Sequence, residues 1–262
     1  MRIYILFIFF YLSINSYGMD PKKEYIFIPS DFGIEFNEIC VDFDNYSLFI
    51  WDSCPKNPIE DKTILLAYGD FGNMSYYINY VKLYTDLGYR VITFDYRGFG
   101  KSSDFKINRK VLYHEEFVTD FDNVIYYCKN KLGVNNITVV SLSMGTLITS
   151  LSNEKNYIES IIAEGAVFDS NHILERLKEK KLQLPQNYKN TIKGWEEFEV
   201  KILIFAGTLD NVTTIGDAHN IVNQNNYNRR LVEYNGTHLS ILNKECNRRK
   251  YFEMVKQFLN DE

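Results

Sequence analysis

The chain has 262 residues, of which 45% are hydrophobic and 24% are charged, and its net charge at pH 7 is −5. This length and composition are those of one globular domain with a large core. The acidic balance argues against a nucleic-acid-binding protein, which would need a basic face. The 20 Tyr and 19 Phe are many for this length, and we expect them to pack in the core and sheet rather than to form an aromatic binding surface.

Residues 1–18 are predicted to be a cleaved secretory signal peptide. Arg2 supplies a short positive region, residues 3–12 are apolar throughout, and Ser16 and Gly18 place small residues at a cleavage site. The apolar run is too short to cross a bilayer, which takes about 20 residues. The mature protein would be secreted or periplasmic, with no stable membrane span. The alternative is an uncleaved N-terminal membrane anchor.

Residues 19–262 are predicted to form a single domain in which strands and helices alternate. Alternating polarity over 34–53 predicts an antiparallel hairpin. Further strands are expected at 63–68, 90–95, 160–164, 201–206 and 229–234, with another beginning at Ile137, and helices at 74–87, 115–131 and 244–260. This order implies a mostly parallel sheet with helices on both faces. Ligand sites in such sheets lie at the carboxyl ends of the strands.

Residues 170–197 break this alternation, because they are rich in charge and contain Pro185. They are predicted to form either a small lid or a plain surface helix with a loop. In an exported chain Cys40 and Cys54, which flank the hairpin, could come close enough to pair, whereas Cys128 is expected to be a buried thiol on a helix. No C-x-x-C motif or His/Cys cluster suggests a metal site.

The most informative motif is Ser141-Leu142-Ser143-Met144-Gly145, which follows the apolar run from Ile137 and precedes a predicted helix. It has the form of a nucleophile elbow, S-x-S-x-G in place of G-x-S-x-G. The strained turn of an elbow needs small residues two before and two after its central serine. Ser143 is therefore the predicted nucleophile.

A serine hydroxyl reacts only when a base removes its proton and an acid orients that base. Asp210 follows the predicted strand 201–206, and His238 follows the strand 229–234. The order serine, acid, histidine is the one that an elbow-type hydrolase uses. We therefore predict a catalytic triad of Ser143, Asp210 and His238, with Asp169 as the alternative acid.

Two backbone N–H groups are predicted to stabilise the oxyanion of the reaction. One belongs to Met144, directly after the nucleophile, and the other to Asp70, in the glycine-containing loop 68–73. A carboxylate near this charge would oppose it, so the Asp70 side chain is expected to point away. The alternative for this loop is a simple β-turn.

These residues resemble the α/β-hydrolase superfamily, and within it the single-domain group of serine aminopeptidase-like and monoacylglycerol lipase-like serine hydrolases. The resemblance covers about residues 34–260 and is most specific in the loop 68–73, the D-Y-R-G-x-G-x-S run at 95–102 and the elbow. It implies hydrolysis of carboxylic esters, thioesters or amides without a cofactor. Two positions depart from the family pattern: Tyr68 stands where His is usual, and Ser141 stands where Gly is usual.

The sequence therefore predicts an exported serine hydrolase with an α/β-hydrolase fold and a minimal lid. It would cleave a small-molecule acyl substrate, most simply a carboxylic ester, through an acyl-enzyme on Ser143. A peptidase or an acyltransferase on the same triad is one alternative. A non-catalytic binding protein that keeps the fold is another.

Overall fold

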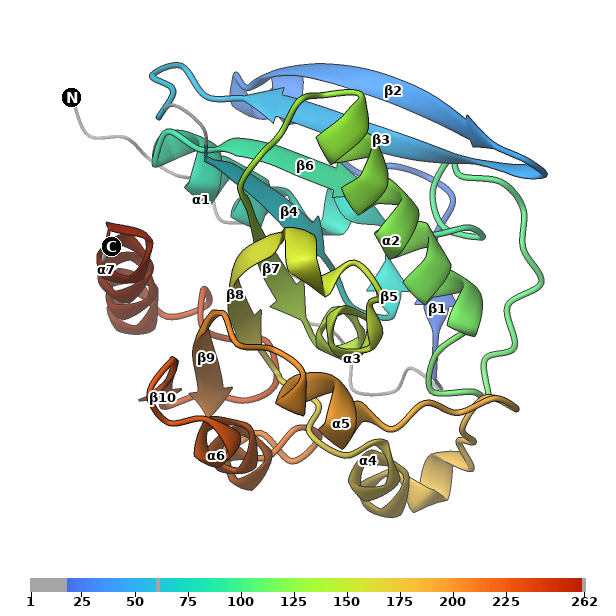
Figure 1. Cartoon of the computed structure of the whole chain (residues 1–262), viewed down its shortest axis with the longest axis vertical. Coiled ribbons are helices and arrows are strands. Elements are labelled where there is room, and N and C mark those ends of the chain that lie inside the picture. The colour runs from blue at the N-terminus through green and yellow to red at the C-terminus, as the bar shows by residue number, and fades with distance from the viewer. Residues whose placement is uncertain (1–17, 60–61, 261–262) are drawn as a thin grey trace.

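The computed structural model describes residues 18–59 and 62–260, so the predicted signal peptide, apart from Gly18, lies outside the described residues. One sheet of eight strands runs through the molecule (Figure 1). Its strands, in spatial order, are β10 (Arg229–Tyr234), β9 (Lys201–Gly207), β8 (Ile158–Glu164), β7 (Ile137–Leu142), β4 (Thr63–Ala67), β6 (Arg90–Phe94), β3 (Tyr46–Cys54) and β2 (Glu35–Phe43).

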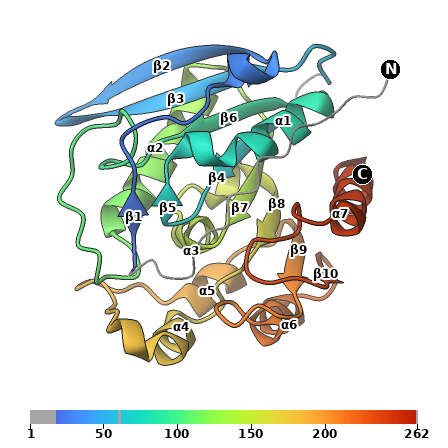
Figure 2. The same ribbon diagram turned by 180° about the vertical axis from the view of Figure 1, so that it is seen from behind.

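The strands from β10 to β6 are parallel to one another. Strand β3 is antiparallel to β6, and β2 is antiparallel to β3. Every residue of β4 and β7 is buried, as expected for central strands that helices cover on both faces. Helices α2 (Glu115–Asn130) and α3 (Met144–Leu151) lie in front of the sheet in Figure 1. Helix α1 (Ile78–Asp86) lies in front of it in Figure 2, which shows the opposite side. The α/β fold predicted from the sequence is therefore confirmed.

Local differences from the predicted elements are small. The helix expected at 74–87 begins with the 3-10 turn η2 (Met74–Tyr77) before α1, and β8 begins two residues earlier than predicted. The C-terminal helix α7 spans Glu245–Asn260. Aromatic side chains fill the core as expected, because the largest fully buried side chains are all Trp, Tyr or Phe. None of the described helices combines the length and the apolar content that crossing a membrane requires.

The strand register separates the two hairpin cysteines. Cys40 lies opposite Phe49, whereas Cys54 lies opposite Glu35. Positions five residues apart along a strand are about 17 Å apart, far beyond the reach of a disulfide. Both thiols are free, so the expectation that they come close enough to pair is wrong. Cys128 is a buried free thiol, as predicted.

Two further features lie beside the carboxyl ends of the strands. A short strand near the start of the described chain, β1 (Asp20–Pro21), pairs in parallel with β5 (Phe71–Gly72), which the sequence patterns did not predict. The Asp20 N–H donates to the Asp70 carbonyl at 2.9 Å. The excursion after β8 contains α4 (Ser170–Arg176), the turn η4 (Lys178–Lys180) and α5 (Thr191–Glu196), seen below the sheet in Figure 1.

Candidate active site

The elbow between β7 and α3 holds Ser143 in the left-handed region, with φ 52° and ψ −117°. For a residue with a Cβ, such a conformation costs about 1–3 kcal/mol and persists only where the surroundings enforce it. Gly145 is required by close packing, because a Cβ there would lie 2.0 Å from the Ala67 carbonyl oxygen. The strand, the turn and the helix thus meet as the motif predicts.

The serine that replaces the first glycine of the motif fits without an unpaired hydroxyl. The Ser141 Oγ lies 2.7 Å from the Thr149 Oγ1 one turn into α3, and both residues are fully buried. A buried hydroxyl needs such a partner, since leaving it unpaired costs about 1–3 kcal/mol. The departure at Ser141 therefore leaves the strained geometry of Ser143 in place.

The structure brings the three predicted triad residues together, with His238 between Ser143 and Asp210. The His238 Nε2 lies 2.9 Å from the Ser143 Oγ, and the His238 Nδ1 lies 2.8 Å from the Asp210 Oδ2. Each residue follows a different strand, namely β7, β9 or β10. Neighbouring parallel strands end at the same edge of the sheet, which is why residues far apart in sequence converge here.

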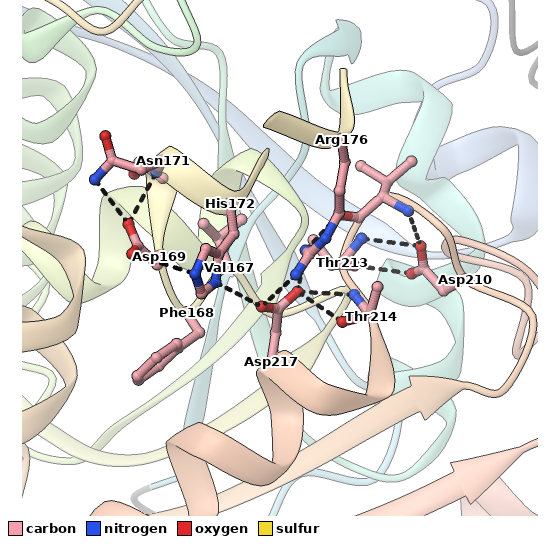
Figure 3. Close-up of polar contacts among 12 residues, drawn as sticks. Val167, Phe168, Asp169, Asn171, His172, Arg176, Asp210, Thr213, Thr214 and Asp217 are labelled. Atoms are coloured by element: carbon pink, nitrogen blue, oxygen red, sulfur yellow. Dashed lines mark hydrogen bonds and ion pairs between the residues drawn. The ribbon is translucent and has the colours of Figure 1, made fainter. Parts of the chain in front are cut away.

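The Asp210 carboxylate is held from several directions in the loop between β9 and α6 (Ile215–Gln224), part of which is drawn in Figure 3. Its Oδ1 accepts from the N–H of Val212 at 2.8 Å and of Thr213 at 3.0 Å, and its Oδ2 accepts from the Thr213 hydroxyl at 2.8 Å. Burial alone would raise the pKa of Asp210, but these hydrogen bonds and His238 together lower it below its ordinary value. The carboxylate therefore remains ionised beside the imidazole.

The other candidate acid lies elsewhere. Asp169 is the N-cap of α4, where its carboxylate accepts from the Asn171 N–H at 2.8 Å. Its other oxygen lies 3.8 Å from the His172 Nε2. Figure 3 marks this contact with a dashed line. Asp169 thus serves the excursion helix, and Asp210 is the carboxylate that contacts His238.

Opposing effects set the protonation of His238. Burial lowers the pKa of the imidazole, whereas the hydrogen bond and charge of Asp210, and the charges of Asp70 and Glu164, raise it, and the net result is a pKa above 6.5. These negative groups all stabilise the imidazolium. The neutral base therefore becomes available only at higher pH than for a free histidine.

A direct consequence is the pH dependence of activity. We expect the rate of ester hydrolysis to fall as the pH decreases through the raised pKa of His238, with a midpoint above about 6.5, because only neutral imidazole accepts the serine proton. The measurement is kcat/KM against pH, with circular dichroism at each pH to show that the fold persists. A flat profile from about pH 5 to about pH 8 in folded protein would exclude His238 as the base.

The loop predicted to supply an oxyanion donor lies directly beside the nucleophile. A Cβ added at Gly69 would lie 3.4 Å from the Ser143 Cβ. Met144 is the first residue of α3, and an N–H at that position has no carbonyl partner within the helix. Asp70 and Met144 line the same cavity as Ser143. Their role as oxyanion donors, with a simple β-turn as the alternative for the loop, stays a prediction.

The Asp70 carboxyl lies near enough to His238 for each group to shift the pKa of the other. The residue lines the same small cavity as Ser143 and Met144. Burial raises the pKa of its carboxyl, which His238, its own backbone N–H and Lys180 lower in part. The backbone of this residue is held by β1, whose Asp20 N–H donates to the Asp70 carbonyl. A negative charge this close to the base would also oppose an oxyanion formed beside Ser143.

Removing this charge should therefore help catalysis. We expect Asp70→Asn to increase kcat on neutral esters and to move the acid limb of the pH profile to lower pH, since Asp70 raises the pKa of His238. A like charge near the oxyanion in a partly solvated site would oppose it by about 1–2 kcal/mol, which is roughly tenfold in rate. Glu175→Gln, an exposed change on α4, is the control. A lower kcat with an unmoved acid limb would show that Asp70 assists the reaction.

The cavity beside Ser143 has a volume of about 70 Å³. One water needs about 10–15 Å³ of such space, so the cavity has room for a group of a few heavy atoms. Apart from Asp70, Lys180 and the residues near the nucleophile, its wall is mainly apolar: Leu112, Leu147, Val167, Ile173, Leu177, Leu182 and Val212. Within residues 18–59 and 62–260, no group of three or more His, Cys, Asp or Glu side chains could hold a metal ion.

Glu164, at the end of β8, is a residue that the sequence motifs missed. Its carbonyl accepts from the Ser143 N–H at 3.0 Å, and its buried carboxylate accepts from the hydroxyls of Tyr80 and Tyr234 and from the Ile241 N–H at 2.6, 2.8 and 3.1 Å. Burial raises the pKa of this carboxyl above its ordinary value. One residue thus joins the elbow to the segment after His238. The only signal was a charged residue ending an apolar strand.

Asp95, the first residue of the D-Y-R-G-x-G-x-S run, explains the tyrosine at the family's histidine position. The Tyr68 hydroxyl donates to the Asp95 Oδ1 at 2.9 Å, and the Met74 N–H donates to the same oxygen at 2.8 Å. Gly100 is needed in this run, because a Cβ there would collide with the Asp95 carboxylate. Through these contacts Asp95 holds both ends of the loop beside the nucleophile, so its role is structural.

Comparisons with known proteins agree with this architecture. Residues 62–198, just over half of the chain, match the sequence profile of the family described as "alpha/beta hydrolase fold". No curated protein matches the chain in sequence.

Solved structures share the fold at low sequence identity. An esterase of Pyrococcus furiosus is 18% identical with a TM-score of 0.76, covering 92% of this chain and 98% of its own. An esterase of Exiguobacterium antarcticum is 18% identical with a TM-score of 0.62, covering 83% and 97%. A Xanthomonas campestris protein described as an α/β serine hydrolase without a lid is 12% identical with a TM-score of 0.65, covering 87% and 97%. With its sheet order, its elbow and this profile match, the chain belongs to the alpha/beta hydrolase fold family.

Proposed function

We propose that this protein is a serine hydrolase that cleaves carboxylic esters, with Ser143 as nucleophile, His238 as base and then acid, and Asp210 as the residue that orients His238. One observation carries the proposal: two hydrogen bonds, of 2.9 and 2.8 Å, connect Ser143 on its strained elbow to His238, and His238 to Asp210. The esterase structures that share the fold support it.

The mechanism follows from these positions. Neutral His238 accepts the Ser143 proton while the Oγ attacks the acyl carbon, and the N–H groups of Met144 and Asp70 hold the resulting oxyanion. His238 then gives the proton to the leaving alcohol, and an acyl-enzyme remains on Ser143. Water, activated by the same imidazole, attacks this ester and releases the acid. Asp210 keeps the Nδ1 protonated and stabilises the imidazolium at both steps.

The cavity supports a preference for short acyl groups. Its volume of about 70 Å³ and its apolar wall suit an acetyl to butyryl chain better than a long one. We expect kcat/KM for p-nitrophenyl esters to be highest for these short acids and to fall for decanoate and longer chains. Equal rates across the series would contradict this preference and leave the triad assignment untouched.

A fluorophosphonate probe tests whether the fold is catalytic at all. An activated serine is phosphonylated, whereas the serine of a non-catalytic binding protein with this fold is not. We expect rapid labelling of the wild type at Ser143, identified by mass spectrometry of the modified peptide. Absence of both labelling and ester hydrolysis in folded protein would favour the binding protein. Amide and thioester substrates, and alcohol acceptors, test the peptidase and acyltransferase alternatives on the same preparation.

We also propose a subgroup within the alpha/beta hydrolase family and a location outside the cytoplasm for this protein. The D-Y-R-G-x-G-x-S run at 95–102 supports placement among the single-domain serine aminopeptidase-like and monoacylglycerol lipase-like hydrolases. The apolar run over 3–12 and the small residues at Ser16 and Gly18 support export with cleavage before Met19. N-terminal sequencing of protein recovered outside the cytoplasm should begin near Met19. Recovery of membrane-bound protein that still begins at Met1 would support the uncleaved anchor.

A further inference from the structure

The excursion helix α4 contacts the loop that carries the triad acid. Its last residue, Arg176, donates through Nη1 to the Val212 carbonyl at 3.0 Å. The same guanidinium forms a bidentate ion pair with Asp217: Nη2 donates to Oδ1 at 3.0 Å, and Nη1 contacts Oδ2 (Figure 3). A planar guanidinium is suited to such a three-way contact, and a lysine ammonium is not.

The partner of this guanidinium is itself fixed. Asp217 lies in the first turn of α6, where its Oδ2 accepts from the Thr214 N–H at 2.8 Å and from the Thr214 hydroxyl at 3.2 Å. Its side chain is 2% exposed and that of Arg176 is 25% exposed. Removing one member of such a pair leaves the other charge poorly compensated. The guanidinium thus has a defined position between α4 and α6.

Val212 connects this pair to the candidate triad. Its carbonyl accepts from Arg176, and its N–H donates to the Asp210 Oδ1 at 2.8 Å. The other oxygen of that carboxylate lies 2.8 Å from the His238 Nδ1. A continuous series of contacts therefore leads from the excursion helix to the imidazole. Movement of the Val212 backbone would move a donor that fixes the acid.

The same helix forms part of the cavity wall through Ile173, with Leu177 directly after it. An acyl group in the cavity therefore contacts the segment that holds the acid loop. Neither predicted alternative for residues 170–197, a small lid or a plain surface helix with a loop, by itself implies a contact with the acid loop. A lid would chiefly affect access of the substrate, and a plain surface helix would affect neither binding nor chemistry.

We propose that Arg176 is a positioning residue for the triad acid, holding the Val212 backbone so that Asp210 keeps its hydrogen bond to His238. The inference rests on the proposed function, because it takes Asp210 as the acid that orients the base. The excursion then acts as a brace for the catalytic loop. Its principal effect falls on the chemical step and not on substrate affinity.

The test compares Arg176→Ala with Arg176→Lys and with the control Glu175→Gln, an exposed change on the same helix. Substrate is p-nitrophenyl butyrate, and kcat is corrected for the fraction of protein that a fluorophosphonate labels to completion. We expect kcat to fall roughly 10–100-fold in Arg176→Ala, as for a misplacement of about 1 Å, with KM changed much less. Arg176→Lys should fall between, and Glu175→Gln should match the wild type.

Three further readouts separate positioning from general loss of structure. The acid limb of the pH profile of Arg176→Ala should move to lower pH, because a looser Asp210 raises the pKa of His238 less, while the charges of Asp70 and Glu164 remain. Added ethylguanidinium should restore part of kcat in Arg176→Ala and none in Asp217→Asn. In NMR spectra, the downfield Nδ1–H proton of His238 should be seen in the wild type and be shifted or broadened in Arg176→Ala.

An unchanged kcat and acid limb in folded Arg176→Ala would overturn the proposal, as would a rise in KM alone. Failure of the proposed function would look different. The wild type itself would then neither hydrolyse the ester nor react with the fluorophosphonate. The NMR comparison still decides the positioning role in that case, because it needs no substrate.

Discussion

Replacing Ser143 with alanine is expected to abolish ester hydrolysis, with a loss on the order of 10⁶ in kcat, the loss found when a hydrolase loses its serine nucleophile. The acyl-enzyme cannot form without the Oγ. The fold should persist, because alanine keeps the Cβ and the backbone conformation at φ 52°, and only the contact with the His238 Nε2 is lost. Turnover of p-nitrophenyl butyrate and thermal unfolding of the same preparation measure both effects.

Ser141→Ala provides a matched control in the same motif. Its hydroxyl bonds to Thr149 and not to His238, so activity should remain while the free energy of unfolding falls by about 1 kcal/mol. Comparison of Ser143→Ala with Ser141→Ala therefore distinguishes loss of the nucleophile from loss of a buried hydrogen bond. Wild-type turnover in Ser143→Ala, free of contaminating esterase, would mean that another residue is the nucleophile.

Asp210→Asn should reduce kcat by on the order of 10⁴, as the equivalent change does in a serine protease triad. The amide keeps the size of the side chain but cannot stabilise the imidazolium, and it favours the wrong tautomer of His238. Because Asp210 also raises the pKa of His238, any residual activity should show an acid limb at lower pH. The measurements are single-turnover rates and the pH profile of the variant.

Asp169→Asn is the control, since asparagine caps a helix about as well as aspartate does. Its carboxylate serves α4 through Asn171, so activity and stability should change little. The opposite result, a severe loss in Asp169→Asn and a mild one in Asp210→Asn, would exchange the roles of the two residues. The two variants together decide which acid belongs to the triad.

The residues that the sequence predicts well are those whose position follows from local patterns. An apolar strand followed by S-x-S-x-G fixes both the turn and the direction of Ser143, and the ends of parallel strands bring Asp210 and His238 to the same edge of the sheet. The positions of these residues depend only on the periodicity of single segments and on the common direction of parallel strands, and not on contacts between particular side chains.

What the sequence could not predict depends on contacts between distant segments. The pairing of β1 with β5 beside the nucleophile could not be predicted, because two-residue strands leave no periodic signal. The ion pair between Arg176 and Asp217, which are 41 positions apart in the sequence, joins α4 to α6. The separation of Cys40 from Cys54 follows from the short turn after Phe43, which fixes the register, whereas flanking a hairpin in sequence does not place two residues side by side.

The double attachment of Glu164 has a consequence for heat inactivation. Because its carbonyl holds the serine turn and its carboxylate holds Ile241 and Tyr234 near His238, the spacing between nucleophile and base depends on one buried residue of a central strand. Opening the segment after His238 would remove donors from a buried carboxylate, and opening the elbow would break a backbone hydrogen bond to a central strand. Both events should cost nearly as much free energy as global unfolding. Residual activity and native structure should therefore disappear at the same temperature, with no inactive folded form preceding the melt.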